Sequence, residues 1–253
     1  MLDLILENRK LKKQLEIAEK WIKREVLSNI KNINIERISG ESIGQKENFF
    51  SENIEELVYN QVSDFFGEER FIYFSKDILE NIVSSELLFS FLRKNKQVDG
   101  LAMLISYQKI FDLLVEEQIT KPFRKYFNSK NLTFSLENDL IEKNLYNVLF
   151  NGHILGFSRF FALLKNISED KVKFPYSKTF LEFLEKYSYI KNILLDDEFL
   201  DLYGKIVDLE VFGAKRHIGK VSFDDIFLTR KYFFGDFVDK NCFFYKLSFI
   251  YEI

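Results

Sequence analysis

Residues 213–220 form the densest group of side chains in the sequence that could do chemistry. Within these eight residues, Lys215, Arg216, His217 and Lys220 can carry positive charge. Lysine and arginine side chains bind phosphate, and a histidine titrates close to neutral pH, as a general acid or base requires. The segment therefore indicates either a phosphate-binding site with an acid–base pair, His217 and Arg216, or a solvated basic turn between two helices.

The sequence offers few other kinds of site. It contains neither a glycine-rich phosphate loop nor a cysteine pair, and it has no HExxH motif. Its acidic clusters, at 196–198 and 224–225, stand at expected helix starts, where carboxylates cap a helix and complement its dipole. The single cysteine, Cys242, lies beside an aromatic run and is interpreted as a small buried hydrophobic residue. We therefore expect no metal and no other cofactor.

The elements that must position the basic segment are predicted to be helices. The chain of 253 residues has only 2 Pro and 10 Gly but 29 Phe, and few segments alternate at period two. Pro122 should kink or end one helix, and Ser222 with Asp225 makes a capping-box variant that starts another. Apolar spacing and end signals predict helices over 52–66, 75–93, 99–121, 135–150, 154–166, 177–195, 197–212 and 222–234. The fold is thus predicted to be all-α, with the phenylalanines mostly in its core.

The first thirty residues carry a heptad pattern. Its a and d positions include Leu4, Asn8, Leu11, Leu15 and Ile22. An asparagine at an a position fixes the register of a two-stranded coil. The pattern predicts a coiled-coil arm over 1–31 that forms a homodimer, or alternatively an amphipathic helix docked on its own domain. Residues 32–53 are interpreted as a linker, and 54–253 as one helical domain.

Charge and hydropathy narrow the classes of partner. The formal net charge of −3 gives no overall attraction to nucleic acid, so any such binding must rest on local basic patches. No stretch approaches about 18 uncharged apolar residues, and no signal peptide is visible at the N-terminus. A single cysteine fits a reducing compartment. We therefore expect a cytoplasmic protein with no membrane association.

The sequence from Ser84 to the C-terminus resembles the HEPN domains of prokaryotes, a helical superfamily common in toxin, RNA-processing and antiviral systems. The segments that carry the resemblance are 84–91 with 99–117, 151–164 around Gly156, and 180–237. In ribonucleolytic members a turn carries an Arg, then four to six residues, then a His. Two protomers combine their copies into one metal-independent RNA-cleaving site. His217 occupies the place of that His, whereas residues 210–212 are Glu, Val and Phe and supply no Arg.

The resemblance implies a HEPN-like helical bundle that binds RNA, or cleaves it without a metal, in a prokaryotic defence or toxin system. His217 would transfer protons, and Arg216 would hold phosphate together with Lys215 and Lys220. The departure at the arginine position leaves a second interpretation open: a catalytically inactive dimeric module that binds or inhibits a protein or RNA partner of a defence system. A plain helical scaffold is the third.

Overall fold

The computed structural model describes residues 57–212 and 219–251, and the regular structure in these ranges is entirely helical. The prediction of an all-α fold is therefore confirmed. The predicted arm and linker lie outside the described residues, together with the dimerisation candidates Leu4, Asn8, Leu11, Leu15 and Ile22. None of the helices in the described ranges combines the length and the apolar character needed to cross a membrane.

Residues 57–66 are helical and stop at Gly67, whose φ of +79° suits the predicted C-terminal stop. The elements of the first half that follow are α3 (Glu68–Phe71), α4 (Lys76–Lys94), α5 (Leu101–Val115), the π-helix η1 (Glu116–Thr120), α6 (Lys121–Ser129) and α7 (Leu140–Phe150). Those of the second half are α8 (Phe157–Ser168), α9 (Pro175–Lys186), α10 (Ser188–Leu194), α11 (Asp197–Val207), the short η2 (Glu210–Phe212), α13 (Phe223–Phe234), η3 (Gly235–Phe237), α14 (Phe243–Ser248) and η4 (Phe249–Tyr251).

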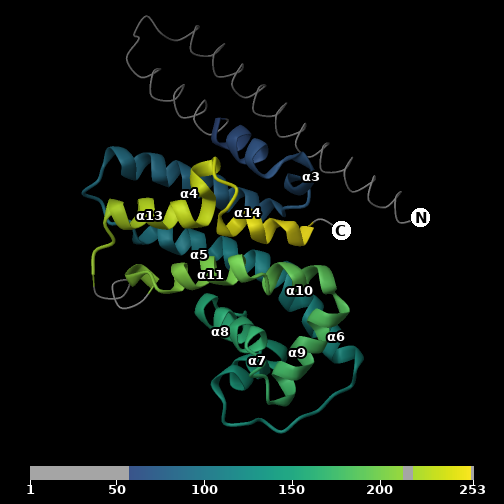
Figure 1. The fold of residues 1–253 in the computed structure, drawn as a ribbon. Helices are drawn as coiled ribbons and strands as arrows, with labels where there is room; N and C mark the ends of the chain where they lie inside the picture. The colour runs from purple at the N-terminus through teal and green to yellow at the C-terminus, as the bar shows by residue number, and fades with distance from the viewer. Residues whose placement is uncertain (1–56, 213–218, 252–253) are drawn as a thin grey trace, which may run out of the picture.

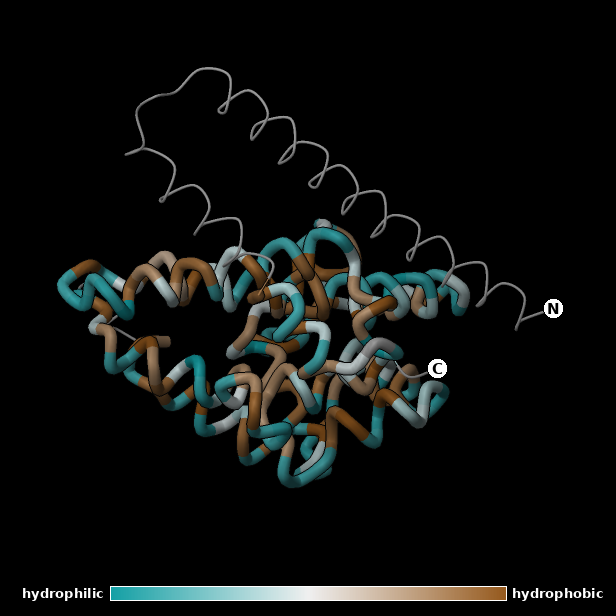
Figure 2. The backbone as a smooth tube through the Cα atoms, turned by 90° about the horizontal axis from the view of Figure 1, so that it is seen from above, coloured by the Kyte–Doolittle hydropathy of each residue, from teal (hydrophilic) through white to brown (hydrophobic). Residues whose placement is uncertain are grey.

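Helix α5 is the central helix of the fold. It packs against α4, α8 and α13, and Figure 1 shows it beneath α4 and α13 and above the lower group of α7, α8 and α9. Five of its side chains are completely buried: Met103, Leu104, Tyr107, Ile110 and Phe111. Along the other helices hydrophobic and hydrophilic residues are mixed (Figure 2), and the hydrophobic ones supply most of the buried core.

Aromatic side chains from five helices meet beside α5. The ring of Phe157 lies 4.8 Å from that of Phe111 and 4.7 Å from that of Tyr203, centroid to centroid. Phe243 of α14 lies 4.9 Å from Tyr203 and 5.5 Å from Phe233. Edge-to-face and tilted contacts of this kind add to the free energy gained from burying the rings. The phenylalanines, including those near the C-terminus, therefore serve mainly as core, as predicted.

A buried ion pair joins α4 to α13. The Arg230 guanidinium donates from Nε and Nη2 to Glu86 Oε2 at 2.9 and 2.8 Å, and it also contacts the Asp236 carboxylate. It lies between the rings of Phe89 and Phe237, at 4.4 and 5.3 Å from their centroids. Because Glu86 and Arg230 are 4% and 7% exposed, water does little to compensate their charges. The Arg230 charge is compensated by Glu86 and Asp236, and the Glu86 charge is compensated by Arg230.

The chain stays helical through Pro122. Helical residues run continuously from 101 to 129, and Pro122 is the second residue of α6. The preceding turn is the π-helix η1, whose wider spacing accommodates a residue that has no N–H to donate and whose ring crowds the turn before it. The predicted interruption therefore takes the form of a π segment.

The end of α11 lies at Val207 rather than at 212 and the start of α8 at Phe157 rather than at 154, and two further predicted helices also differ. The helix predicted over 177–195 is divided into α9 and α10 at Tyr187, which has ψ of 66° and has no glycine or proline beside it. The helix predicted from 135 begins instead at Leu140, because the Asp139 carboxylate accepts hydrogen bonds from the backbone N–H groups of Ile141 and Glu142 at 2.8 and 3.0 Å. These differences leave the order of the helices unchanged.

Candidate nucleic-acid interface

The base of the basic turn is attached to the loop between α4 and α5. Lys215, Arg216 and His217 lie outside the described residues, whereas Lys220 lies within them. The Lys220 ammonium group donates a hydrogen bond to the backbone oxygen of Gln97. A backbone hydrogen bond joins the same two segments: Gly100 N–H donates to the oxygen of Val221, the residue after Lys220, at 2.9 Å. The turn therefore ends beside a loop that is distant in sequence.

The Asp99 carboxylate connects the start of α5 to the residue that follows the basic turn. Asp99 Oδ1 accepts a hydrogen bond from Leu101 N–H in the first turn of α5, at 3.0 Å, and another from Val221 N–H, at 3.2 Å. The capping box predicted at the start of α13 is also present. Ser222 Oγ accepts from Asp225 N–H at 3.2 Å, and Asp225 Oδ2 accepts from Ser222 N–H at 2.9 Å. The carboxylates closest to the turn thus cap helices.

Glycine is required where the loop meets α13. A Cβ atom at Gly100 would lie 2.4 Å from Cγ1 of Ile226, which is far inside van der Waals contact. Ile226 itself is fully buried, so it has little room to move away. The backbone of the loop therefore rests directly on α13, and its position relative to the turn is fixed by packing as well as by hydrogen bonds.

This attachment brings the cations of two segments to the same edge of the molecule. We call Arg93, Lys94, Lys96 and Lys220 the basic edge. All four side chains are exposed, and none forms an ion pair with another residue that the structure describes. Sequence inspection singled out only Lys220. A cationic run at the end of α4 is an ordinary complement to the helix dipole, so the sequence gives no reason to choose the other three.

Aromatic side chains adjoin the basic edge on α13. The Lys96 ammonium group lies 5.3 Å from the centroid of the Phe223 ring, and that ring stacks on Phe89 of α4 at 5.6 Å. One turn further along α13, Phe227 is 47% exposed, and its neighbour Leu228 is 42% exposed. Cations beside exposed aromatic and apolar groups can bind both the phosphates and the bases of a nucleic acid.

Residues 211 and 212, where the resemblance led us to look for an arginine, are buried in the core. Phe212 is 9% exposed, and its ring stacks on Phe157 at 5.3 Å with an interplanar angle of 21°. Val211 is buried beside it. Arg159, a distant arginine in the sequence, donates a hydrogen bond from Nη1 to Asn144 Oδ1 at 3.1 Å. Residues 211 and 212 therefore supply no cation to a phosphate.

The remaining chemical candidates have structural roles. Cys242 is 1% exposed, and burial raises the pKa of its thiol to about 12, so the interpretation as a buried hydrophobic residue is confirmed. Asp196 caps α11 by accepting from Phe199 N–H at 2.9 Å, as predicted for that acidic cluster. Across residues 57–212 and 219–251, no three His, Cys, Asp or Glu side chains are grouped so that they could hold a metal ion.

Comparisons of the chain with protein families, with curated proteins and with solved structures find no match. The functional assignment therefore rests on the chemistry of the basic edge and its neighbours.

Proposed function

We propose that this protein is a HEPN-like RNA-binding protein, and that the basic edge and the turn over residues 213–220 together contact the RNA backbone. The observation that carries the proposal is the attachment of Lys220 to the Gln97 carbonyl, which gathers cations from segments far apart in sequence. Exposed cations without carboxylate partners keep their full charge for phosphates.

RNA is favoured over an acidic protein surface by the aromatic side chains beside the cations. Lys96 and Phe223 are adjacent, and Phe227 presents part of its ring to solvent one helical turn away. An acidic protein surface would match the cations through its carboxylates, whereas every nucleotide of an RNA carries a base that can stack on these rings. RNA supplies phosphates for the cations and bases for the aromatic side chains, so it can contact both groups at once.

Cleavage of the bound RNA would depend on His217 and Arg216. In a metal-independent reaction the 2′-hydroxyl attacks the adjacent phosphorus and the bond to the 5′-oxygen breaks. This leaves a cyclic phosphate on one product and a 5′-hydroxyl on the other. His217 would transfer the proton, and Arg216 would stabilise the charge on the phosphate. A homodimer formed through the arm at residues 1–31 would bring two copies of this pair into one assembly.

The binding proposal is tested by fluorescence anisotropy with a labelled single-stranded RNA. The double variant K94A/K96A should bind at least about tenfold more weakly than the wild type, because two phosphate contacts are lost. The matched control K121A/K125A removes two exposed lysines from α6 and should change the affinity by less than about twofold. Equal effects of the two double variants, or no binding by the wild type, would overturn the proposal in favour of a module that binds protein.

The cleavage step is tested separately by incubating the same RNA with the wild type and with H217A. We expect H217A to keep its RNA affinity and its oligomeric mass while losing the cyclic-phosphate product. Cleavage that continues at the wild-type rate in H217A would remove the assignment of His217. A wild type that binds RNA but never cleaves it would identify a binding protein without catalysis.

A further inference from the structure

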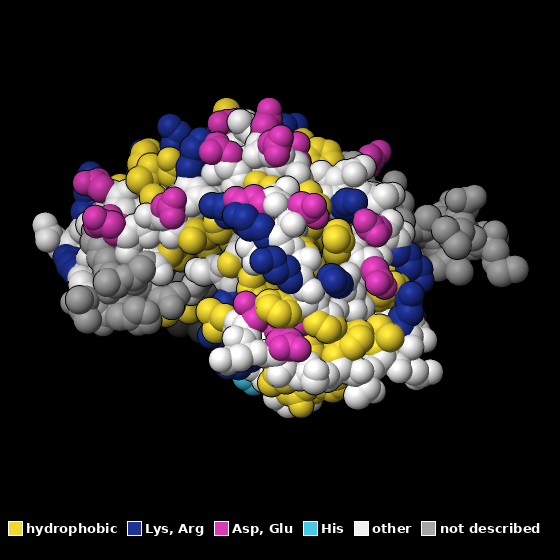
Figure 3. Space-filling model, turned by 60° about the horizontal axis from the view of Figure 1, so that its bottom comes forward, with side chains coloured by type: hydrophobic (Ala, Val, Ile, Leu, Met, Phe, Trp, Pro, Cys, Tyr) yellow, Lys and Arg dark blue, Asp and Glu magenta, His cyan; other side chains and the backbone are white. Residues whose placement is uncertain are grey.

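A second surface feature lies at the end of the molecule opposite the N-terminal part of α5, between α9 and the loop that follows α6. It is a groove of about 490 Å³ lined by Lys130, Leu132, Phe134, Lys173, Pro175, Lys178, Thr179 and Glu182, which we call the α9 groove. Figure 3 turns this lower end toward the viewer and shows Lys and Arg side chains near the middle of the face, beside exposed hydrophobic ones. The volume falls within the range of about 300–1,000 Å³ that is usual for small-molecule sites.

The walls of the α9 groove are held in place from behind. The completely buried Glu142 carboxylate accepts hydrogen bonds from the N–H groups of Tyr176 and Ser177, at 3.0 and 2.8 Å, and so fixes the start of α9. The Tyr176 hydroxyl donates to the Phe134 backbone oxygen at 3.2 Å, and the two rings meet edge to face at 5.3 Å. The groove is therefore formed before any ligand enters, which lowers the entropic cost of binding.

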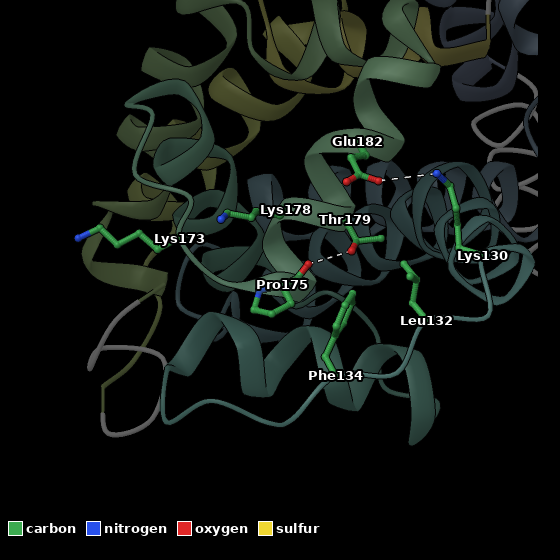
Figure 4. Close-up of a pocket in the computed structure, with 8 residues that line it drawn as sticks. All are labelled: Lys130, Leu132, Phe134, Lys173, Pro175, Lys178, Thr179 and Glu182. Carbon is green, nitrogen blue, oxygen red and sulfur yellow. Dashed lines mark hydrogen bonds and ion pairs between the residues drawn. The ribbon is translucent and has the colours of Figure 1, made fainter.

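The two ends of the groove differ in charge. At one end, Glu182 Oε2 lies 3.9 Å from the Lys130 ammonium and accepts a hydrogen bond from the Tyr126 hydroxyl at 3.4 Å. At the other end, Lys173 and Lys178 form no ion pair with any residue in the described ranges. Figure 4 shows Lys173 and Lys178 extending to one side and the Lys130–Glu182 pair on the other, with Pro175 and Phe134 below. The groove thus has a cationic end, an apolar middle and a polar end where a donor and an acceptor are paired.

We propose that the α9 groove binds a nucleoside monophosphate. Its phosphate would lie against Lys178 and Lys173, and its planar base would pack on Phe134 and Pro175. The polar edge of the base would meet the Lys130–Glu182 pair, which offers both a donor and an acceptor. A purely apolar ligand would leave the two lysines unused, and an inorganic anion would leave the apolar middle unfilled. This site is separate from the basic edge and does not depend on RNA binding.

Isothermal titration calorimetry with AMP and with adenosine tests the proposal on the full-length protein. AMP should bind, and adenosine should bind at least about tenfold more weakly, because it lacks the charged group that the lysines recognise. The variant K173A/K178A should weaken AMP binding at least about tenfold, while the control variant K94A/K96A at the basic edge should leave it unchanged. Urea unfolding of each variant confirms that the fold is retained.

Three results would overturn the proposal: no heat of binding with AMP, equal affinities for AMP and adenosine, or equal AMP affinities of the wild type and K173A/K178A. As a second variant, E182Q retains the two lysines and the apolar middle but loses the charged acceptor. It should weaken AMP and adenosine binding by the same factor, because it acts on the base and not on the phosphate. A larger loss with AMP than with adenosine would contradict the proposed orientation.

Discussion

The Lys220 side chain donates a hydrogen bond to the backbone oxygen of Gln97, although 123 residues separate them in the sequence. Together with the bond from Gly100 N–H to the Val221 oxygen, it attaches the end of the basic turn to the loop between α4 and α5. The loop carries Lys96, and α4 ends just before it with Arg93 and Lys94. The attachment adds Lys220 to these three cations, so a local basic surface exists even though the whole chain has a net charge of −3.

Removing the Asp99 carboxylate should loosen this junction. Asp99 Oδ1 accepts from Leu101 N–H and from Val221 N–H, so D99A leaves two backbone donors without their acceptor. We expect the free energy of unfolding to fall by about 1–2 kcal/mol, the usual cost of losing a helix cap. Urea titration followed by circular dichroism measures it. The control E137A removes an exposed carboxylate that lies in a loop outside any helix, and equal losses in the two variants would show that Asp99 holds nothing together.

Breaking the buried Glu86–Arg230 pair should be costly, and replacing both partners should not be. R230M leaves the Glu86 carboxylate buried without its guanidinium, for which we expect a loss of about 3–5 kcal/mol in unfolding free energy. In E86L/R230M neither charge is buried unpaired, so much of that loss should be recovered. The two single variants and the double variant form a cycle that urea unfolding can complete. A double variant whose loss equals the sum of the single losses would contradict the coupling of these residues.

The order of the helices was within reach of the sequence because each depends on local signals. Ser222 with Asp225 marks the start of α13, and Gly67 ends the helix over 57–66. Both signals are local, because a cap or a positive φ value depends on a few neighbouring residues. The division at Tyr187 was not predictable, because no glycine or proline stands there. The interruption at Pro122 was predictable from the proline, but its form as a π segment was not, because a proline does not specify how the helix before it adjusts.

The candidate site was only half predictable. Lys220 belongs to a motif that sequence inspection recognises, but Arg93, Lys94 and Lys96 join it through contacts between segments more than a hundred residues apart. Periodicity and capping signals contain no information on such pairings. The α9 groove was missed for the same reason, since its lysines come from the end of α6, from the segment before α9 and from α9 itself.

Stability should depend on pH through Asp112. Burial raises the pKa of this carboxyl to about 6, above its ordinary value of 3.8. The folded protein therefore binds the proton more tightly than the unfolded chain does, and Asp112 costs stability as the pH rises from about 4 to about 6. The variant D112N should equal the wild type in unfolding free energy near pH 4 and exceed it at pH 7 by about 1–2 kcal/mol, allowing for partial exposure. A difference that does not change with pH would contradict this.

Removal of the first thirty residues should weaken self-association. The heptad residues Leu4, Leu11 and Leu15 are among those predicted to form the seam of a two-stranded coil. Analytical ultracentrifugation should show a dimer for the full chain and a shift toward monomer for the shortened one. The full-length variant L11E/L15E should behave like the shortened chain, because charges in the seam prevent pairing. An unchanged dimer in both would place the contact between protomers in the helical domain instead.

The salt dependence of RNA affinity tests the central claim most directly. Binding through phosphate contacts lowers log K linearly with log salt concentration, by about 0.7 per contact for single-stranded RNA. The triple variant K94A/K96A/K220A should therefore have a slope smaller in magnitude by about 2 than that of the wild type. An affinity that does not vary with salt, or a slope that is the same in the wild type and the triple variant, would contradict RNA binding at the basic edge.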